Sequence, residues 1–135
     1  MEINILHLYY DLLNLYGENG NIKALKKHLE EQNVKVNIEF LTLNDKIDFK
    51  RYDFVYIGAG TEKNLNLALK DLIKYKKSIK EYIESNKFFL ATGNSIVLFG
   101  KNLKEENITH KCLNIFDYES AEEDFRMVDQ AVFNM

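Results

Sequence analysis

Four segments of the chain have the hydrophobic patterns of β-strands. Three are short, largely apolar runs, as in strands that are buried on both faces, at 3–8, 53–57 and 88–91. In the fourth, at 34–40, apolar and polar residues alternate with period two. This alternation predicts a strand with one face in the core and the other in solvent.

The segments between these strands have helical periodicity instead. Apolar residues recur every three or four positions in 22–32, in 65–73 and in 79–83, which predicts one helix and later two consecutive ones. Asn21 can supply the N-cap of the first helix. Strands that alternate with helices imply βαβ units, and hence a mostly parallel sheet.

The pattern is weaker after residue 100. We predict a fifth strand within 108–115 and a final strand at 126–133, separated by an acidic turn at 117–124. The length of 135 residues fits one domain, and no linker or repeat divides the chain. The sequence therefore predicts a single three-layer α/β domain of the doubly wound, flavodoxin-like type over residues 1–135.

Composition and charge exclude several classes of function. The net charge of −3 gives no indication of nucleic-acid binding, and no apolar run approaches the roughly 20 residues of a membrane span. The single cysteine, Cys112, fits a reducing cytosol and is expected in the core, and residues 1–6 lack the features of a secretion signal. We expect a cytoplasmic protein without a metal site or a cofactor, because no ligand spacing is diagnostic of one.

Three turns that contain glycine fall at predicted strand ends or just beyond them, at 17–20, 58–60 and 92–95. In open α/β sheets, ligands bind outside the carboxyl ends of the strands. We therefore expect the functional site where these three turns meet.

The segment 88–100 has the pattern of a nucleophile elbow. A buried strand runs into the small residues Thr92-Gly93-Asn94-Ser95 and then into a helix start. In an elbow the residue at the tip presents its reactive atom to the substrate. Here the tip is Gly93, so the segment predicts the shape of a catalytic centre without its nucleophile. Ser95 is expected to cap the helix, and a role as substitute nucleophile is the alternative.

The loop Gly58-Ala59-Gly60 directly follows a buried strand. Its glycines allow the backbone to approach a ligand closely, as an oxyanion-binding loop requires. Two acidic residues, Asp11 and Glu18, flank the first turn and are candidates for contact with a ligand. His7 ends the first strand and is expected to orient the loop that follows it, with direct catalysis as the alternative.

With these motifs the chain resembles the class I glutamine amidotransferases of the cobyric-acid-synthase-like type. Among them it is most similar to the GatD-type glutaminase subunits, which partner the Mur-ligase-like MurT in amidating lipid II. The resemblance is strongest over 7–21, His-Leu-Tyr-Tyr-Asp-Leu-Leu-Asn-Leu-Tyr-Gly-Glu-Asn-Gly-Asn, where Tyr10 replaces the usual proline. The loop 58–60 matches a Gly-Gly-Gly pattern, from which Ala59 departs. The resemblance covers nearly all of the chain but only the N-terminal part of the family domain.

The resemblance implies a cysteine nucleophile activated by a histidine, which release ammonia from glutamine for a partner synthetase. The family pattern Leu-Ala-Ile-Cys-Gly-Gly-Tyr-Gln-Leu-Leu-Gly, laid on 90–100, puts Gly93 at the nucleophile. Asn94 and Ser95 replace the two glycines, and Val97 replaces the glutamine. Several neighbouring positions have therefore changed together.

Two further residues of the family's site bear on function. Arg126 corresponds to an arginine that contacts glutamine, whereas no residue matches the catalytic histidine, since His110 follows the elbow too closely. We expect an amidotransferase-like domain without glutaminase activity that acts as a binding or scaffolding module. Its partner would be a Mur-ligase-like or other synthetase, or a second copy of the chain. Two alternatives stay open: a glutaminase subunit completed by another chain, and a small-molecule binder that uses the glycine loop as an amide or anion pocket.

Overall fold

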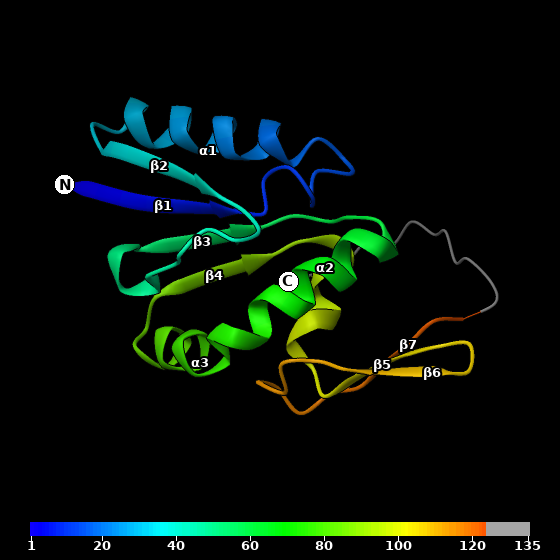
Figure 1. Cartoon of the computed structure of the whole chain (residues 1–135). Coiled ribbons are helices and arrows are strands. Elements are labelled where there is room, and N and C mark those ends of the chain that lie inside the picture. The colour runs from blue at the N-terminus through cyan, green and yellow to red at the C-terminus, as the bar shows by residue number, and fades with distance from the viewer. Residues whose placement is uncertain (124–135) are drawn as a thin grey trace, which may run out of the picture.

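A computed structural model describes residues 1–123 and contains a four-stranded parallel sheet. Its strands are β1 (Glu2–Leu8), β2 (Lys35–Leu41), β3 (Phe54–Ile57) and β4 (Phe88–Ala91), in the spatial order β2-β1-β3-β4 (Figure 1). All three pairings are parallel. This is the strand order of the flavodoxin-like fold, and the predicted α/β fold is confirmed.

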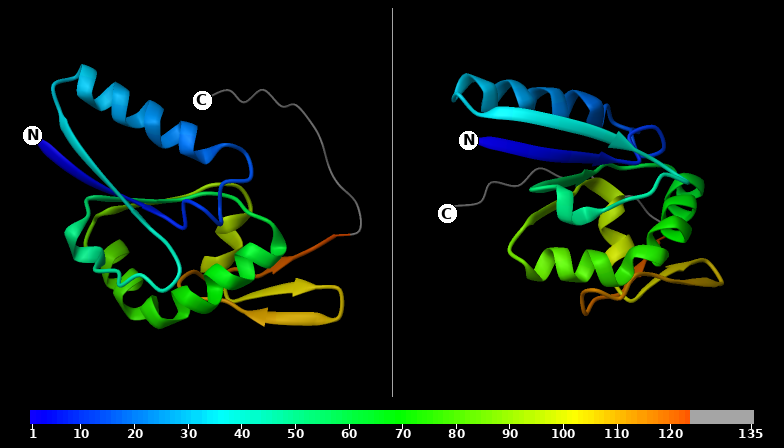
Figure 2. Two further views of the ribbon diagram at one scale, coloured as in Figure 1. Left: turned by 45° about the horizontal axis from the view of Figure 1, so that its top comes forward. Right: turned by 60° about the vertical axis from the view of Figure 1, so that its left-hand side comes forward.

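Helices cover both faces of this sheet (Figures 1 and 2). Helix α1 (Glu18–Glu31) lies on one face, and α2 (Glu62–Leu72) and α3 (Lys76–Glu84) lie on the other. A 3₁₀ turn at Ile73–Tyr75 joins the last two. Another 3₁₀ segment, Phe49–Arg51, precedes β3. The predicted three layers are therefore present.

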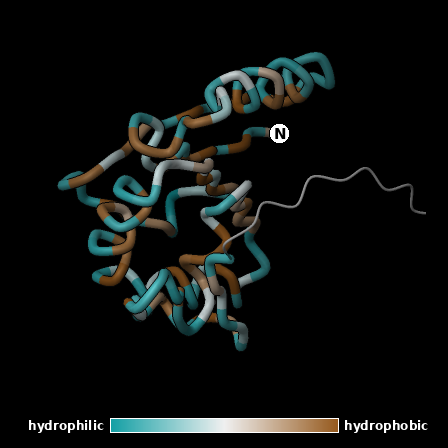
Figure 3. Tube along the Cα trace, turned by 90° about the vertical axis from the view of Figure 1, so that its right-hand side faces the viewer, coloured by the Kyte–Doolittle hydropathy of each residue, from teal (hydrophilic) through white to brown (hydrophobic). Residues whose placement is uncertain are grey.

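Alternate residues of β1 supply the two sides of the core. Ile5 packs with Ile22 of α1, whereas Leu6 and Leu8 face the opposite side, where they join residues of α2 and α3 such as Leu72. Along the helices, apolar and polar positions alternate in bands (Figure 3), as expected for helices that bury one side only. The central strand is consequently buried on both faces.

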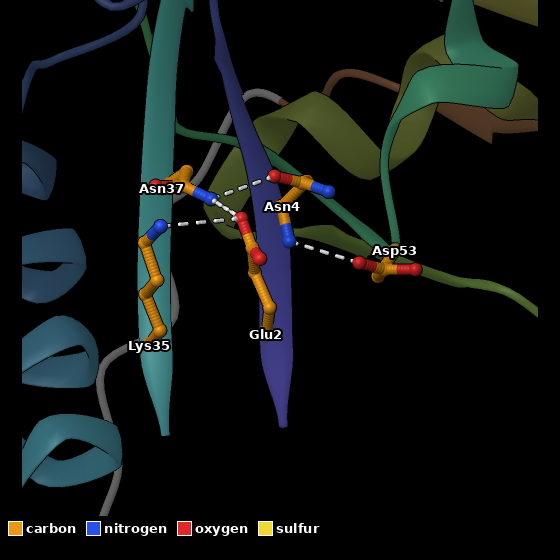
Figure 4. A network of polar contacts seen from close by, with 5 residues as sticks. All are labelled: Glu2, Asn4, Lys35, Asn37 and Asp53. Atoms are coloured by element: carbon orange, nitrogen blue, oxygen red, sulfur yellow. Dashed lines mark hydrogen bonds and ion pairs between the residues drawn. The ribbon is translucent and has the colours of Figure 1, made fainter. Parts of the chain in front are cut away.

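The polar residues Lys35 and Asn37 of β2 are exposed, as the period-two pattern predicts. Lys35 and Asn37 of β2 lie beside Glu2 and Asn4 of β1, and the Asn37 amide donates to both neighbours on β1 (Figure 4). The carboxylate of Asp53 accepts from the backbone N–H of Asn4 at 2.8 Å. These side chains form a solvated network at a part of the sheet that the helices leave open.

The first helix starts earlier than predicted. It begins at Glu18 after Gly17, which adopts the left-handed conformation with φ 77°. The side chain of Asn14 accepts from the N–H of Asn19 and satisfies one of the helix's first donors, a task predicted for Asn21. Asn21 lies inside the helix and donates to the Tyr56 hydroxyl instead. Because the capping side chain comes from the loop before the helix, the residues next to the helix start do not predict it.

The prediction for the chain after residue 100 was partly wrong. The strand predicted within 108–115 is present as β6 (Ile108–Lys111), but it pairs in an antiparallel hairpin with a strand that was not predicted, β5 (Asn102–Glu105). The two-residue strand β7 (Ser120–Ala121) pairs with β5 in this separate small sheet. The hairpin was missed because β5 has a single apolar residue, Leu103. The predicted strand at 126–133 lies outside the described residues.

Within residues 1–123, β4 is the outer strand of the main sheet on the side away from β2. Its residues Phe88 and Leu90 have 71% and 45% of their surface exposed, because α1 covers the β1–β2 side of this face. An apolar groove of about 430 Å³ runs beside them and is also lined by Ile96 and Phe116. No helix in the described part of the chain combines the length and apolar character needed to cross a bilayer.

The Tyr9 hydroxyl ties the loop after β1 to the end of α2, and we predict that it stabilises the fold. It donates to the buried Asp71 carboxylate at 2.6 Å, and Lys74 contacts the same carboxylate. Tyr9→Phe should lower the free energy of unfolding by about 1–2 kcal/mol, because Asp71 loses its buried donor. Urea denaturation measures the change. The control Tyr16→Phe, at an exposed tyrosine, should stay within about 0.5 kcal/mol; equal losses in both variants would contradict this role.

Candidate functional site

The three turns predicted to form the site meet at the carboxyl ends of β1, β3 and β4. The loop after β1 contacts the glycine loop after β3, where the N–H of Leu15 donates to the carbonyl of Ala59 at 3.0 Å. The glycine loop in turn contacts the turn after β4, through hydrogen bonds between Gly60 and Asn94. The expectation that these segments come together is thus met by their hydrogen bonds.

The turn after β4 has the geometry of an elbow. Strand β4 ends at Ala91, Thr92 is extended, and a 3₁₀ helix, η3 (Gly93–Phe99), follows at once. Gly93 is the exposed tip, with a left-handed backbone at φ 62°. L-residues with side chains adopt this conformation at a cost, which is the strain that a nucleophile elbow stores. The bend is present, and the residue at its tip carries no functional group.

Ala59 fills the space that a side chain at the tip would need. A Cβ atom built on Gly93 would lie 2.7 Å from the Cβ of Ala59, well inside van der Waals contact. Ala59 is 1% exposed and sits in a packed loop. The two positions therefore constrain each other: a methyl group at 59 favours a glycine at 93.

The glycine loop approaches the protein's own chain, and not an open ligand cavity as its pattern suggested. A Cβ on Gly58 would meet the carbonyl oxygen of Leu13 at 2.3 Å and the side chain of Glu18 at 2.6 Å. The Glu18 carboxylate, 3% exposed, accepts from the N–H of Ala59 and from that of Tyr16, each at 2.9 Å. Glu18 thus holds the loops after β1 and β3 together and occupies one of the amides expected to bind an oxyanion.

Asn94 occupies the next amide of the same loop. The N–H of Gly60 donates to Asn94 Oδ1 at 3.1 Å, and Asn94 Nδ2 donates to the Gly60 carbonyl at 2.7 Å. With Glu18 on Ala59, the N–H groups of Ala59 and Gly60 both have partners within the protein. An oxyanion could bind these amides only after Glu18 or Asn94 moved away.

The structure gives Ser95 a different role from the predicted cap. It lies inside the 3₁₀ helix that Thr92 precedes, and its hydroxyl is fully buried. Ser95 Oγ donates to the carbonyl of Thr92 at 2.8 Å, so the hydroxyl points back into the turn. The Thr92 hydroxyl lies 3.3 Å from that of Tyr56. In the part of the chain that the structure describes, neither hydroxyl is hydrogen-bonded to a histidine or a carboxylate that could act as its base.

His7 does not orient the loop after β1 by a hydrogen bond. Its ring is fully buried, with its centroid 5.1 Å from that of Tyr56 and 5.7 Å from that of Phe40, and neither ring nitrogen has a hydrogen-bond partner within residues 1–123. Burial lowers the pKa of His7 from 6.5 to about 4, although the nearby Glu18 raises it in part. The imidazole is therefore neutral near pH 7.

The other candidates lie outside this constellation. His110 Nε2 is 3.2 Å from the Glu105 carboxylate in the small sheet. Cys112 packs in the core as expected, and burial raises the pKa of its thiol. The Asp11 carboxylate accepts from the Thr42 hydroxyl and lies in solvent. Arg126 falls outside the described residues.

A group of carboxylates lies near the small sheet. Glu62, Glu105 and Glu122 each bring an oxygen within 4.8 Å of the others, and Glu62 raises the pKa of Glu122 by charge repulsion. Glu62 and Glu122 are exposed to solvent. Exposed acidic groups of this kind are ordinary on protein surfaces, and we assign no ion to them.

Two residues that organise the site were not assigned this role from the sequence. The sequence indicates Glu18 only as a candidate ligand contact, and Asn94 only as an elbow residue that departs from the family's glycine. In the sequence, the turn of Gly, Glu and Asn around Glu18 resembles an ordinary helix start. Its spacing does not indicate which distant backbone N–H groups the Glu18 carboxylate contacts. The departure from glycine at 94 was the one available signal.

Comparison with known proteins gives the same family as the resemblance. Residues 4–135 match the CobB/CobQ-like glutamine amidotransferase domain. The chain is similar to the lipid II isoglutaminyl synthase (glutamine-hydrolyzing) subunit GatD of Streptococcus pneumoniae, at 35% identity over 100 residues, 74% of this chain and 38% of that protein. The Staphylococcus aureus subunit of the same name is 40% identical over 83 residues, 62% of this chain and 34% of that protein. The chain thus aligns with well under half the length of these relatives.

We predict that His7 makes the protein less stable in mild acid. The unfolded chain takes up a proton near pH 6.5, whereas folded His7 does so only near pH 4. Stability is therefore unaffected by His7 above about pH 7 and falls as the pH drops from 6.5 to 4, by roughly 2–3 kcal/mol in total. His7→Leu should remove this part of the slope, as measured by urea unfolding at pH 7 and pH 5. If wild type and variant lose stability in parallel, the buried imidazole is not the cause.

We predict that positions 59 and 93 are energetically coupled. Gly93→Ala should cost about 2–4 kcal/mol, through left-handed strain together with overlap with Ala59. In an Ala59→Gly background the overlap is gone, so the same substitution should cost only about 1–2 kcal/mol. A double-mutant cycle by chemical denaturation gives the coupling, expected at about 1 kcal/mol or more. Strictly additive losses would show that the two side-chain positions do not compete for one space.

Proposed function

Because the chain belongs to the CobB/CobQ-like glutamine amidotransferase family, we propose that it is an amidotransferase-like domain that does not hydrolyse glutamine. It acts as a binding or scaffolding module. The observation that carries this proposal is Gly93 at the tip of the elbow, where the resemblance implies the cysteine nucleophile.

Amide hydrolysis of this type needs an attacking atom and donors for the charge that develops on the carbonyl oxygen. Gly93 supplies no attacking atom, and the Ser95 hydroxyl is buried and donates to a backbone carbonyl. The amides of Ala59 and Gly60 already bind Glu18 and Asn94. Each of these features argues independently against turnover, and Ala59 adds a steric obstacle to a side chain at the tip.

An exposed apolar surface supports the binding role. Phe88 and Leu90 of β4 and Ile96 of the 3₁₀ helix are exposed beside the groove described above. Exposed apolar side chains that lie next to one another are a common feature of protein interaction sites. The two relatives are named as subunits of a synthase. We propose a Mur-ligase-like or other synthetase as the partner, with a second copy of this chain as the alternative occupant.

A second candidate function is that of a glutaminase subunit that supplies ammonia to such a synthetase. It is favoured by the names of both relatives, which are glutamine-hydrolyzing. It requires a nucleophile other than residue 93. The third candidate, a small-molecule binder that uses the glycine loop, is disfavoured because the loop amides are already bonded within the protein.

The direct test is glutamate release from glutamine by the purified protein, alone and with a candidate synthetase. We expect no release above the rate without protein, because residue 93 offers no nucleophile. Release that is lost in Ser95→Ala or in Cys112→Ala would contradict the proposal and favour the glutaminase subunit.

A gain-of-chemistry variant probes the site itself. The double variant Ala59→Gly/Gly93→Cys provides both the thiol and the space for it. Labelling of this variant by a glutamine-analogue electrophile, with no labelling of wild type, would support a site in which the nucleophile alone is lost. Labelling of wild type at Cys112 or Ser95 would count against the proposed function.

A further inference from the structure

We propose that the outer edge of β4 pairs with the same edge of a second copy of this chain, so that the two parallel sheets join into one. The inference rests on the proposed binding role of this surface. It gives the edge of β4 to the second of the two occupants named above, and a synthetase partner would then contact the dimer.

The edge of β4 carries backbone groups that face away from the sheet. Thr92, directly after β4, donates its N–H to the carbonyl of Ile57 in β3 at 3.1 Å. Successive residues of a strand direct their backbone groups alternately to its two sides, so those of Phe89 and Ala91 point outward. No strand within residues 1–123 pairs with them, because β4 is the last strand in the order β2-β1-β3-β4 (Figure 1).

The two outer strands of the sheet differ in how their edges are protected. β2 carries Lys35, Asn37 and Glu39, and charged side chains on an outer strand oppose its pairing with another sheet. β4 has the sequence Phe-Phe-Leu-Ala over 88–91, without a charged residue or a proline. The unprotected edge is also the one beside the apolar groove of about 430 Å³. The chain therefore permits pairing at β4 and opposes it at β2.

An antiparallel pair centred on Leu90 satisfies every outward backbone group of β4. In this register Phe89 lies opposite Ala91 of the partner copy, and Ala91 lies opposite Phe89 of the partner copy. Each such pair exchanges both of its N–H···O=C bonds. Any other antiparallel register sets Phe89 or Ala91 against a residue outside β4. Leu90 therefore lies on the two-fold axis, opposite its own equivalent, as an interface between two identical surfaces allows.

The apolar surface beside the edge is sufficient for a weak dimer. Phe88, Leu90, Ile96 and Phe116 line the groove and are 71%, 45%, 55% and 47% exposed. Taking an aromatic side chain as roughly 200 Å², they present roughly 400 Å² of apolar surface per copy. Stable interfaces bury about 800 Å² per partner, and weak ones bury less. We therefore expect a dissociation constant in the micromolar range.

Sedimentation equilibrium of the purified protein over about 1–500 µM measures the association. We expect a monomer–dimer equilibrium in wild type. Leu90→Lys sets two like charges against each other on the axis and should raise the dissociation constant at least about tenfold. The matched control Ile108→Lys, at an exposed apolar residue of β6, should leave the constant unchanged. Circular dichroism shows whether each variant is folded.

The outcome of this experiment is independent of glutamine hydrolysis. A wild-type protein that stays monomeric throughout this range would overturn the inference and leave the edge to a synthetase or to residues 124–135 of the same chain. It would not change the absence of a nucleophile at Gly93. Glutamate release by wild type would end the proposed function and leave the dimer standing.

Cysteine crosslinking tests the register. Residues opposite each other at a non-hydrogen-bonded position of antiparallel strands have Cα atoms about 4.5 Å apart, within reach of a disulfide. Leu90→Cys should therefore form disulfide-linked dimers on oxidation with diamide. Phe88→Cys should not, although residue 88 is the more exposed, because it lies opposite Thr92 of the partner copy. Wild type controls for Cys112, and equal crosslinking of both variants would overturn the inferred pairing.

Discussion

The buried carboxylate of Glu18 is the contact on which the arrangement of the site depends. It receives the backbone N–H of Tyr16 from its own loop and that of Ala59 from the loop after β3, with both distances at 2.9 Å. Charge-assisted bonds to a buried carboxylate are among the stronger polar contacts in a protein, and the position tolerates no neighbour larger than a glycine at 58. The loop after β3 is therefore held in place by the loop after β1, and this fixed loop supports the turn after β4.

Around the elbow, the residues that depart from the family pattern fit one another in space. A methyl group at position 59 occupies the space over position 93, and an amide at position 94 takes up the backbone groups of Gly60. The changes at positions 59 and 93 depend on each other, because a side chain at 93 would overlap Ala59. Taken together they produce a packed, hydrogen-bonded surface where the resemblance implies an open pocket. The backbone has the shape of an elbow, and the groups around it make contacts within the protein.

The sequence predicts those features of the structure that depend on neighbouring residues, and it misses those that depend on contacts between distant residues. The strands β1 to β4 and the elbow follow from apolar runs and small residues next to one another, and the sequence located them within a residue or two. The start of α1 was placed too late because its first donors are satisfied by Asn14, from outside the helix. The β5–β6 hairpin was missed because a strand with one buried side chain, Leu103, has almost no pattern. The roles of Glu18 and Asn94 depend on partners more than 30 positions away, which no periodicity reports.

The place of β1 in the sheet has a consequence for how the chain acquires its structure. Strand β1 lies between β2 and β3 and precedes both in the chain, so each of its edges can pair only after a later segment has been synthesised. Its pairing with β3 joins Ile5 to Phe54, a separation that makes early local pairing impossible. Parallel sheets of this kind fold slowly, because distant segments must come together at a cost in chain entropy before they form stabilising contacts. On the ribosome the apolar strand Ile3–Leu8 would therefore emerge long before its second neighbour, a stage at which chaperones commonly bind nascent chains.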